Sequence, residues 1–96
     1  MDTLFPLGQI LATPGALGAI AEAGSNPVIW ILRHAAGDWG QLDKFDMTAN
    51  AEALKCGSRI LSAYVLPTGV KIWIITEAED DEGQRAATTI LLPAEY

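Results

Sequence analysis

Apolar residues change their spacing at Ser58, and no other property of the sequence narrows the choice of folds as much. The runs SRILSAYVL and VKIWIITE alternate apolar and polar residues on either side of Pro67-Thr68-Gly69, and a third run, AATTILL, follows an acidic segment. Such alternation is typical of strands, and a short Pro- and Gly-containing segment between two runs is typical of a hairpin. We therefore expect a three-stranded antiparallel meander after Ser58.

The hairpin turn sets the expected register. With Thr68 and Gly69 as the two loop residues, Tyr64 lies opposite Trp73. One face then carries aliphatic side chains that helices would cover: Leu61, Ala63, Val65, Ile72 and Ile74. The other face is mixed aromatic and polar: Ser62, Tyr64, Lys71, Trp73, Ile75 and Glu77. A mixed surface of this kind is either covered by another part of the chain or offered to a partner.

Proline and glycine divide the first half of the chain into three expected helices. Thr13-Pro14 and Asn26-Pro27 have the cap-and-proline pattern of a helix start, and glycines follow the helical runs. The helices are expected at about residues 14–23, 27–36 and 47–56. Their expected buried stripes are Leu17, Ile20 and Ala21, then Val28, Ile31 and Leu32, then Met47, Ala51 and Leu54.

These patterns predict an α+β fold with about three N-terminal helices packed on a C-terminal three- to four-stranded antiparallel β-meander. Residues 1–96 are expected to form a single domain, because the length suits one core. The pattern leaves open whether residues 7–12 join the sheet as a fourth strand. An exposed edge on AATTILL would allow a homodimer by strand pairing.

Composition limits the classes of function. The apolar runs are much shorter than the roughly 20 residues that span a bilayer, and the amino terminus lacks the pattern of a secretory signal. We therefore expect a cytoplasmic protein with no membrane partner. One cysteine and one histidine predict no metal site and no cofactor. Twelve acids against six bases disfavour a nucleic-acid partner unless the protein is a ribonuclease.

A dispersed set of polar residues permits two functions. His34 as general acid or base, Arg59 as phosphate ligand, and Tyr64 and Thr89 beside them would suit a metal-independent ribonuclease. Each also has a structural interpretation: a histidine bonded at its helix end, a salt-bridged arginine, a cross-strand aromatic pair and a strand threonine. The residues that suit a protein-binding surface are Ser62, Tyr64, Trp73, Glu77, Asp38 and Trp39.

Nearly the whole chain resembles a family of short bacterial proteins. The resemblance is carried by FPLGQILATPGAL, RHAAGDWG, GSRILSAY, KIWIITEAED and TTILLPAEY. Members of that family are labelled plasmid-related or hypothetical and accompany antirestriction-type genes on mobile elements, with no established activity. The order of helices and meander is also similar to the barnase, EndoU, colicin and RelE class of ribonucleases, with His34 on a helix and Arg59, Ser62, Tyr64 and Thr89 on strands.

The charge balance favours protein binding, whereas the set of polar residues favours catalysis. Ribonuclease toxins of that class are typically basic, whereas this chain has a net charge of −6. We therefore expect first a small acidic accessory protein of mobile genetic elements, which acts by protein binding, with counter-defence as one role. The Tyr64/Trp73 face or the acidic segment from Glu77 to Arg85 would bind the partner. The alternative is the ribonuclease.

Overall fold

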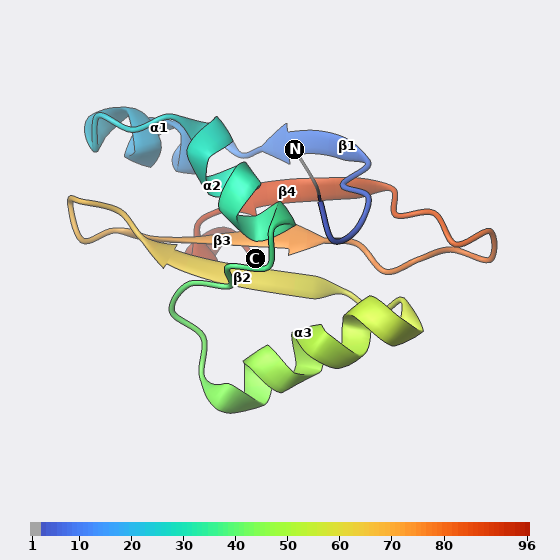
Figure 1. The fold of residues 1–96 in the computed structure, drawn as a ribbon. Helices are drawn as coiled ribbons and strands as arrows, with labels where there is room; N and C mark the ends of the chain where they lie inside the picture. The colour runs from blue at the N-terminus through green and yellow to red at the C-terminus, as the bar shows by residue number, and fades with distance from the viewer. Residues whose placement is uncertain (1–2) are drawn as a thin grey trace.

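The computed structural model describes residues 3–96 and shows a four-stranded sheet whose helices lie, in sequence, between its first two strands (Figure 1). The strands are β1 (Gln9–Ala12), β2 (Ile60–Val65), β3 (Lys71–Thr76) and β4 (Ala87–Leu91). The helices are α1 (Pro14–Glu22), α2 (Pro27–Ala35) and α3 (Lys44–Cys56), and a short 3-10 turn, η1 (Pro93–Glu95), follows β4. None of the helices in this part of the chain is long and apolar enough to cross a membrane.

The α+β class is confirmed, but the expected arrangement is wrong in two respects. A strand precedes the helices, so they occupy the middle of the chain rather than its amino-terminal end. The sheet is mixed, with strand order β1-β4-β3-β2, because β1 runs parallel to β4 while the other neighbours are antiparallel. Residues 9–12 therefore form the fourth strand, and they occupy the β4 edge that was expected to be exposed.

The hairpin register differs from the expected one by one residue. Leu66 N–H donates to the Val70 carbonyl (2.8 Å) and Gly69 N–H to the Leu66 carbonyl (2.8 Å), which leaves Pro67-Thr68-Gly69 as a three-residue loop. Tyr64 consequently lies opposite Ile72 rather than Trp73. Since neighbouring side chains point to opposite faces, this slip turns β2 over.

The consequence is a different division of the two faces. Ile72 and Ile74 are fully buried under the helices, as expected. Ser62 and Tyr64 join them in the interior, whereas Ala63 lies on the opposite face beside Trp73. The expected Tyr64/Trp73 surface therefore does not exist.

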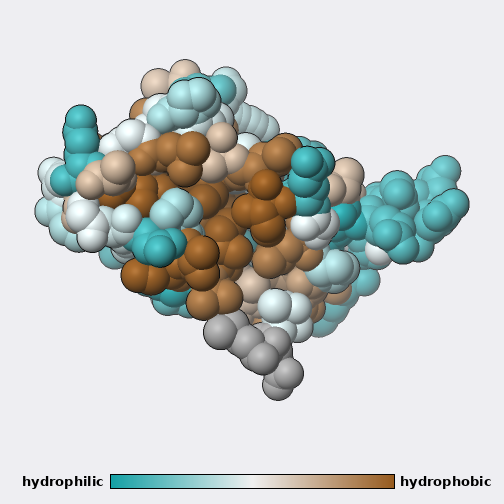
Figure 2. Space-filling model, turned by 90° about the horizontal axis from the view of Figure 1, so that it is seen from above, coloured by the Kyte–Doolittle hydropathy of each residue, from teal (hydrophilic) through white to brown (hydrophobic). Residues whose placement is uncertain are grey.

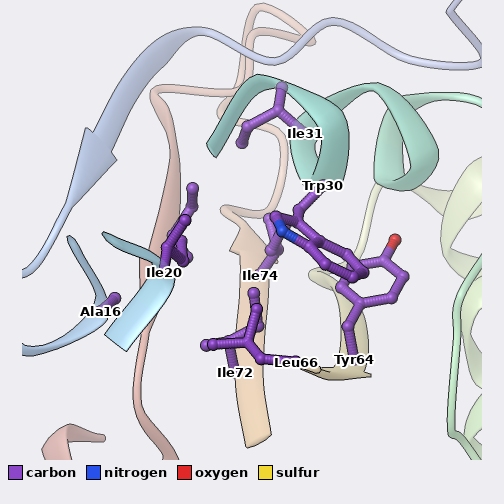
Figure 3. Close-up of a cluster of buried hydrophobic side chains, with 9 residues drawn as sticks. Ala16, Ile20, Trp30, Ile31, Tyr64, Leu66, Ile72 and Ile74 are labelled. Carbon is purple, nitrogen blue, oxygen red and sulfur yellow. The ribbon is translucent and has the colours of Figure 1, made fainter. Parts of the chain in front are cut away.

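The main core lies between the sheet and the pair α1 and α2 (Figure 3). Thr13 and Asn26 cap these helices by accepting from Ala16 N–H (3.1 Å) and Val28 N–H (2.9 Å), as their sequence pattern predicts. The core consists of Ala16, Ile20, Trp30, Ile31, Tyr64, Leu66, Ile72, Ile74 and Ile90.

The buried stripes of the helices are shifted from those expected. α1 buries Ala16 and Ile20, α2 buries Trp30, Ile31, His34 and Ala35, and α3 buries Asn50 and Ala53. Five of the aliphatic and Met side chains expected inside are instead 36% to 56% exposed: Leu17, Val28, Leu32, Met47 and Leu54. In α3 the buried positions are a polar and a small residue, and the Asn50 side chain bonds to the Leu61 backbone.

α3 and the loop before it close the outer edge of β2. The Asn50 side chain donates to the Leu61 carbonyl (2.6 Å) and accepts from Leu61 N–H (3.1 Å), as a neighbouring strand would. Ala63 N–H donates to the Trp39 carbonyl (3.1 Å), and Gln41 N–H donates to the Ala63 carbonyl (2.6 Å). α3 therefore lies beside β2 rather than on the face of the sheet (Figure 1).

Candidate functional site

His34 is fully buried at the centre of a chain of hydrogen bonds. Its Nδ1 is 2.5 Å from Ser62 Oγ, and its Nε2 is 2.8 Å from Thr76 Oγ1. Thr76 Oγ1 is 2.7 Å from Thr88 Oγ1, which donates to the Leu7 carbonyl (2.7 Å). Side chains from α2 and three strands thus meet inside the molecule.

The last bond of this chain fixes the direction of the others. Each hydroxyl donates one proton, so Thr88, which donates to Leu7, accepts from Thr76. Thr76 must in turn accept from His34 Nε2–H. Neutral His34 therefore accepts at Nδ1 from the Ser62 hydroxyl, and every member has a partner.

This pairing of Ser62 with His34 resembles an activated nucleophile, but its burial excludes that role. Both residues are completely inaccessible to solvent. The rings of Phe5 and Trp39 pack against the imidazole at centroid distances of 5.2 Å and 5.9 Å. Loss of hydration lowers the pKa of His34 to about 4, which keeps it neutral near pH 7.

Tyr64 is a core residue on the same face of the sheet. Its ring packs against Trp30 at 5.3 Å, and its hydroxyl donates to the Asp38 carbonyl (2.5 Å). Burial raises its pKa to about 12. Tyr64 therefore holds the loop after α2 instead of facing a substrate.

Asp38 and Trp39 belong to that loop and also hold it in place. The Asp38 carboxylate accepts from Arg33 Nε (2.7 Å) and from Gly40 N–H (3.2 Å), and the Arg33 bond is the main cause of its lowered pKa. Trp39 is partly buried and stacks on Phe5. Both residues thus have structural partners.

Arg59 and Thr89 lie on the opposite face of the sheet, away from His34 and Tyr64. The four residues of the ribonuclease hypothesis therefore share no cleft. General acid–base catalysis needs its groups within reach of one substrate. This arrangement gives that hypothesis no support.

The face with Arg59 and Thr89 is covered by no helix other than η1 among residues 3–96. It holds a recess of about 240 Å³, which is lined by Arg59, Ile75, Glu77, Thr89, Leu91 and Tyr96. Ile75 and Leu91 are largely buried and form its apolar floor. Glu77 and Trp73, two of the expected binding residues, lie in and beside this recess.

Tyr96 forms one wall of the recess. Its ring meets Trp73 edge-on at 5.7 Å, the Arg59 guanidinium lies 5.4 Å from the ring centroid, and Arg59 also donates to the Tyr96 hydroxyl. The sequence analysis placed Ile75 on the mixed face but missed Tyr96 and Leu91 as site residues, because Tyr96 reaches the recess only after the chain folds back through η1. Pro93, the first residue of η1, was the one signal of that reversal.

The acidic segment begins at the recess and extends away from the sheet. Figure 2 shows a hydrophilic projection at one end of the molecule, and Figure 1 shows the β3–β4 connection at the same end. Its acids are Glu77, Glu79, Asp80, Asp81 and Glu82, all exposed.

The base that ends this segment, Arg85, is buried and bonded to the backbone. It donates to the carbonyls of Ser58 (2.7 Å), Glu77 (3.0 Å) and Ala53 (3.1 Å), and it lies 3.8 Å from the Glu79 carboxylate. Among the described residues, Glu79 is the one acid of the segment whose carboxylate lies within 4.0 Å of a basic side chain. The exposed acids give the end of the segment a negative surface.

Within residues 3–96, no three His, Cys, Asp or Glu side chains converge as metal ligands would. No protein-family profile, curated protein or solved structure matches this chain. The recess and its acidic border are therefore interpreted from their own chemistry.

Proposed function

We propose that this protein is a non-enzymatic accessory protein that binds another protein through the recess and the adjoining acidic segment. The observation that carries the proposal is the recess itself. It has an apolar floor and is bordered by unlike charges, and it lies on a sheet face that, among residues 3–96, only η1 covers. The resemblance to plasmid-related proteins favours a role on mobile elements, including counter-defence.

The size of the recess favours a side chain of a partner over a separate small molecule. Sites for small molecules usually enclose about 300–1,000 Å³, whereas this recess has about 240 Å³. The most important contacts of protein interfaces are large side chains that fill pockets of this kind. Ile75 and Leu91 suit an apolar or aromatic anchor.

The acidic segment next to the recess selects the charge of the partner. Glu77 lies between the recess and the acidic segment, and the chain as a whole has a net charge of −6. Complementary charges steer association and disfavour wrong partners. The partner is therefore a basic segment in which one apolar anchor lies among Lys or Arg residues.

A selection from a random-peptide library tests this function. Peptides enriched on the protein should be basic and contain an apolar anchor, and their addition should shift the amide signals of Ile75, Thr89 and Leu91 in NMR spectra. Glu77→Lys should weaken binding at least about tenfold, since it places a cation against the partner.

Glu52→Lys is the matched control, because it makes the same charge change at an exposed position on α3. If both substitutions weakened binding equally, the effect would come from the overall charge of the protein and not from the recess, and the proposed site would be refuted. Enrichment of acidic peptides, no enrichment, or signal shifts away from the recess would also refute it.

A further inference from the structure

The end of the molecule formed by β1, α1 and α2 exposes a continuous apolar surface (Figure 2). Its large side chains are 36% to 58% exposed: Leu4, Ile10, Leu17, Val28, Ile29 and Leu32. We call this surface the apolar end. Monomeric soluble proteins seldom expose contiguous apolar patches of more than a few hundred Å² without a binding role.

β1 also leaves one side of its backbone without a neighbouring strand. Gln9 N–H donates to the Ala86 carbonyl (3.0 Å), and Thr13 N–H donates to the Ile90 carbonyl (3.0 Å). The backbone N–H groups of the odd-numbered residues therefore point toward β4. By alternation, the N–H and C=O groups of Ile10 and Ala12 point outward. Gln9–Ala12 contains no charged residue and no proline, the usual means of keeping a strand edge from pairing.

The distribution of charge identifies what fits this end. Residues 3–32 contain one charged residue, Glu22, in a chain whose net charge is −6. Two copies can therefore meet here without bringing carboxylates together. A basic protein or a nucleic acid would find no opposite charge to pair with.

We infer that the protein forms a homodimer in which the β1 strands of two copies pair antiparallel about a two-fold axis. The outward groups of Ile10 and Ala12 then bond to their counterparts, and the two apolar ends pack together. A two-fold interface needs a self-complementary patch, which a strand edge with apolar flanks provides. A stable interface needs about 800 Å² of accessible surface buried on each partner. This area is roughly one seventh of the 5561 Å² accessible surface of the chain.

Sedimentation equilibrium and amide hydrogen exchange test this inference. The chain of 10.2 kDa should sediment as a dimer at micromolar concentration, and the Ile10 and Ala12 amides should be protected. Ile10→Lys should raise the dissociation constant at least about tenfold, because it buries an unpaired charge in the interface. Val65→Lys is the matched control, at an equally exposed strand position (45% against 48%) far from β1.

A monomer under these conditions would overturn the inference. So would a dimer whose Ile10 and Ala12 amides exchange freely, or one that Ile10→Lys leaves intact, since the copies would then meet elsewhere. Peptide binding at the recess is measured separately and uses a different face. A monomeric protein would therefore leave the proposed peptide binding untouched, and a protein that binds no basic peptide would leave the proposed dimer untouched.

Discussion

Lowering the pH should destabilise this protein already at pH values higher than those at which its carboxylates titrate, because His34 is buried in its neutral form. Its pKa is about 4 in the folded protein and 6.5 when unperturbed. As the pH falls, the unfolded chain takes up the proton first, so the free energy of unfolding decreases. Linkage between these two pKa values gives a loss of about 2 kcal/mol by about pH 5 and about 3 kcal/mol by about pH 4.

The range between about pH 7.5 and pH 5 isolates this effect. The pKa of Asp38 is lowered chiefly by the Arg33 hydrogen bond and that of Glu95 chiefly by the Thr13 hydrogen bond. Stabilisation from such carboxylates is present above their unfolded pKa values and is lost mainly below about pH 5. Urea unfolding at a series of pH values therefore measures the histidine contribution.

His34→Gln is the control, because an amide can also accept from Ser62 and donate to Thr76 but does not titrate in this range. Its stability should be nearly constant from about pH 7.5 to pH 5. His34 is the only histidine in the chain, so its ring protons give the folded pKa directly by NMR, whether or not the variant folds. A measured pKa near 6.5, or a wild-type free energy of unfolding that does not change, would refute the buried network.

Three further substitutions test the structure by urea unfolding. Thr76→Val should lower the free energy of unfolding by about 1–3 kcal/mol, because it leaves the buried His34 Nε2–H without an acceptor and removes the donor to Thr88. Thr89→Val at the partly exposed recess should change the free energy of unfolding little, and equal effects would contradict the hydrogen-bond chain. Gly40→Ala should lower the free energy of unfolding by at least about 1–3 kcal/mol, because Gly40 has φ +73° and lies against the Ala63 carbonyl. Gly18→Ala, in open space within α1, should raise the free energy of unfolding by about 0.5–1 kcal/mol. Asn50→Ala should cost about 1–3 kcal/mol by exposing unpaired groups on the edge of β2, and an unchanged midpoint would show that α3 does not close that edge.

Local patterns predicted the helices and strands better than their partners. The caps at Thr13 and Asn26 act within one turn, so the sequence specifies them. The pairing of β1 with β4 joins residues about eighty positions apart, and a four-residue strand carries too little pattern to show it. The predicted register of the hairpin was wrong because Pro67-Thr68-Gly69 closes as a three-residue loop. A shift of one residue turns every side chain of β2 to the opposite face.

Predictions of the site residues were likewise right where they rested on local pattern and wrong where they rested on strand register or distant contacts. Glu77 and Trp73 were expected at a binding face and do lie at the recess, because the inward direction of Ile72 and Ile74 was inferred correctly. Ser62 and Tyr64 were placed on that face only through the wrong register. Burial of His34 depends on hydroxyls from three strands, and nothing near it in sequence indicates them.

The parallel pairing of β1 with β4 also affects how the chain is made. During synthesis β1 leaves the ribosome before the three α-helices and the β2–β3 hairpin, whereas its partner strand β4 leaves after them. Until then Ile10 and Leu11 have neither a sheet nor the β4 backbone to pair with, and unpaired apolar strands are prone to aggregation. The helices can form early, but the four-stranded sheet is complete only after β4 has been synthesised. Slow elongation, or truncation before Ala87, would therefore leave both β1 and β3 with an unpaired edge.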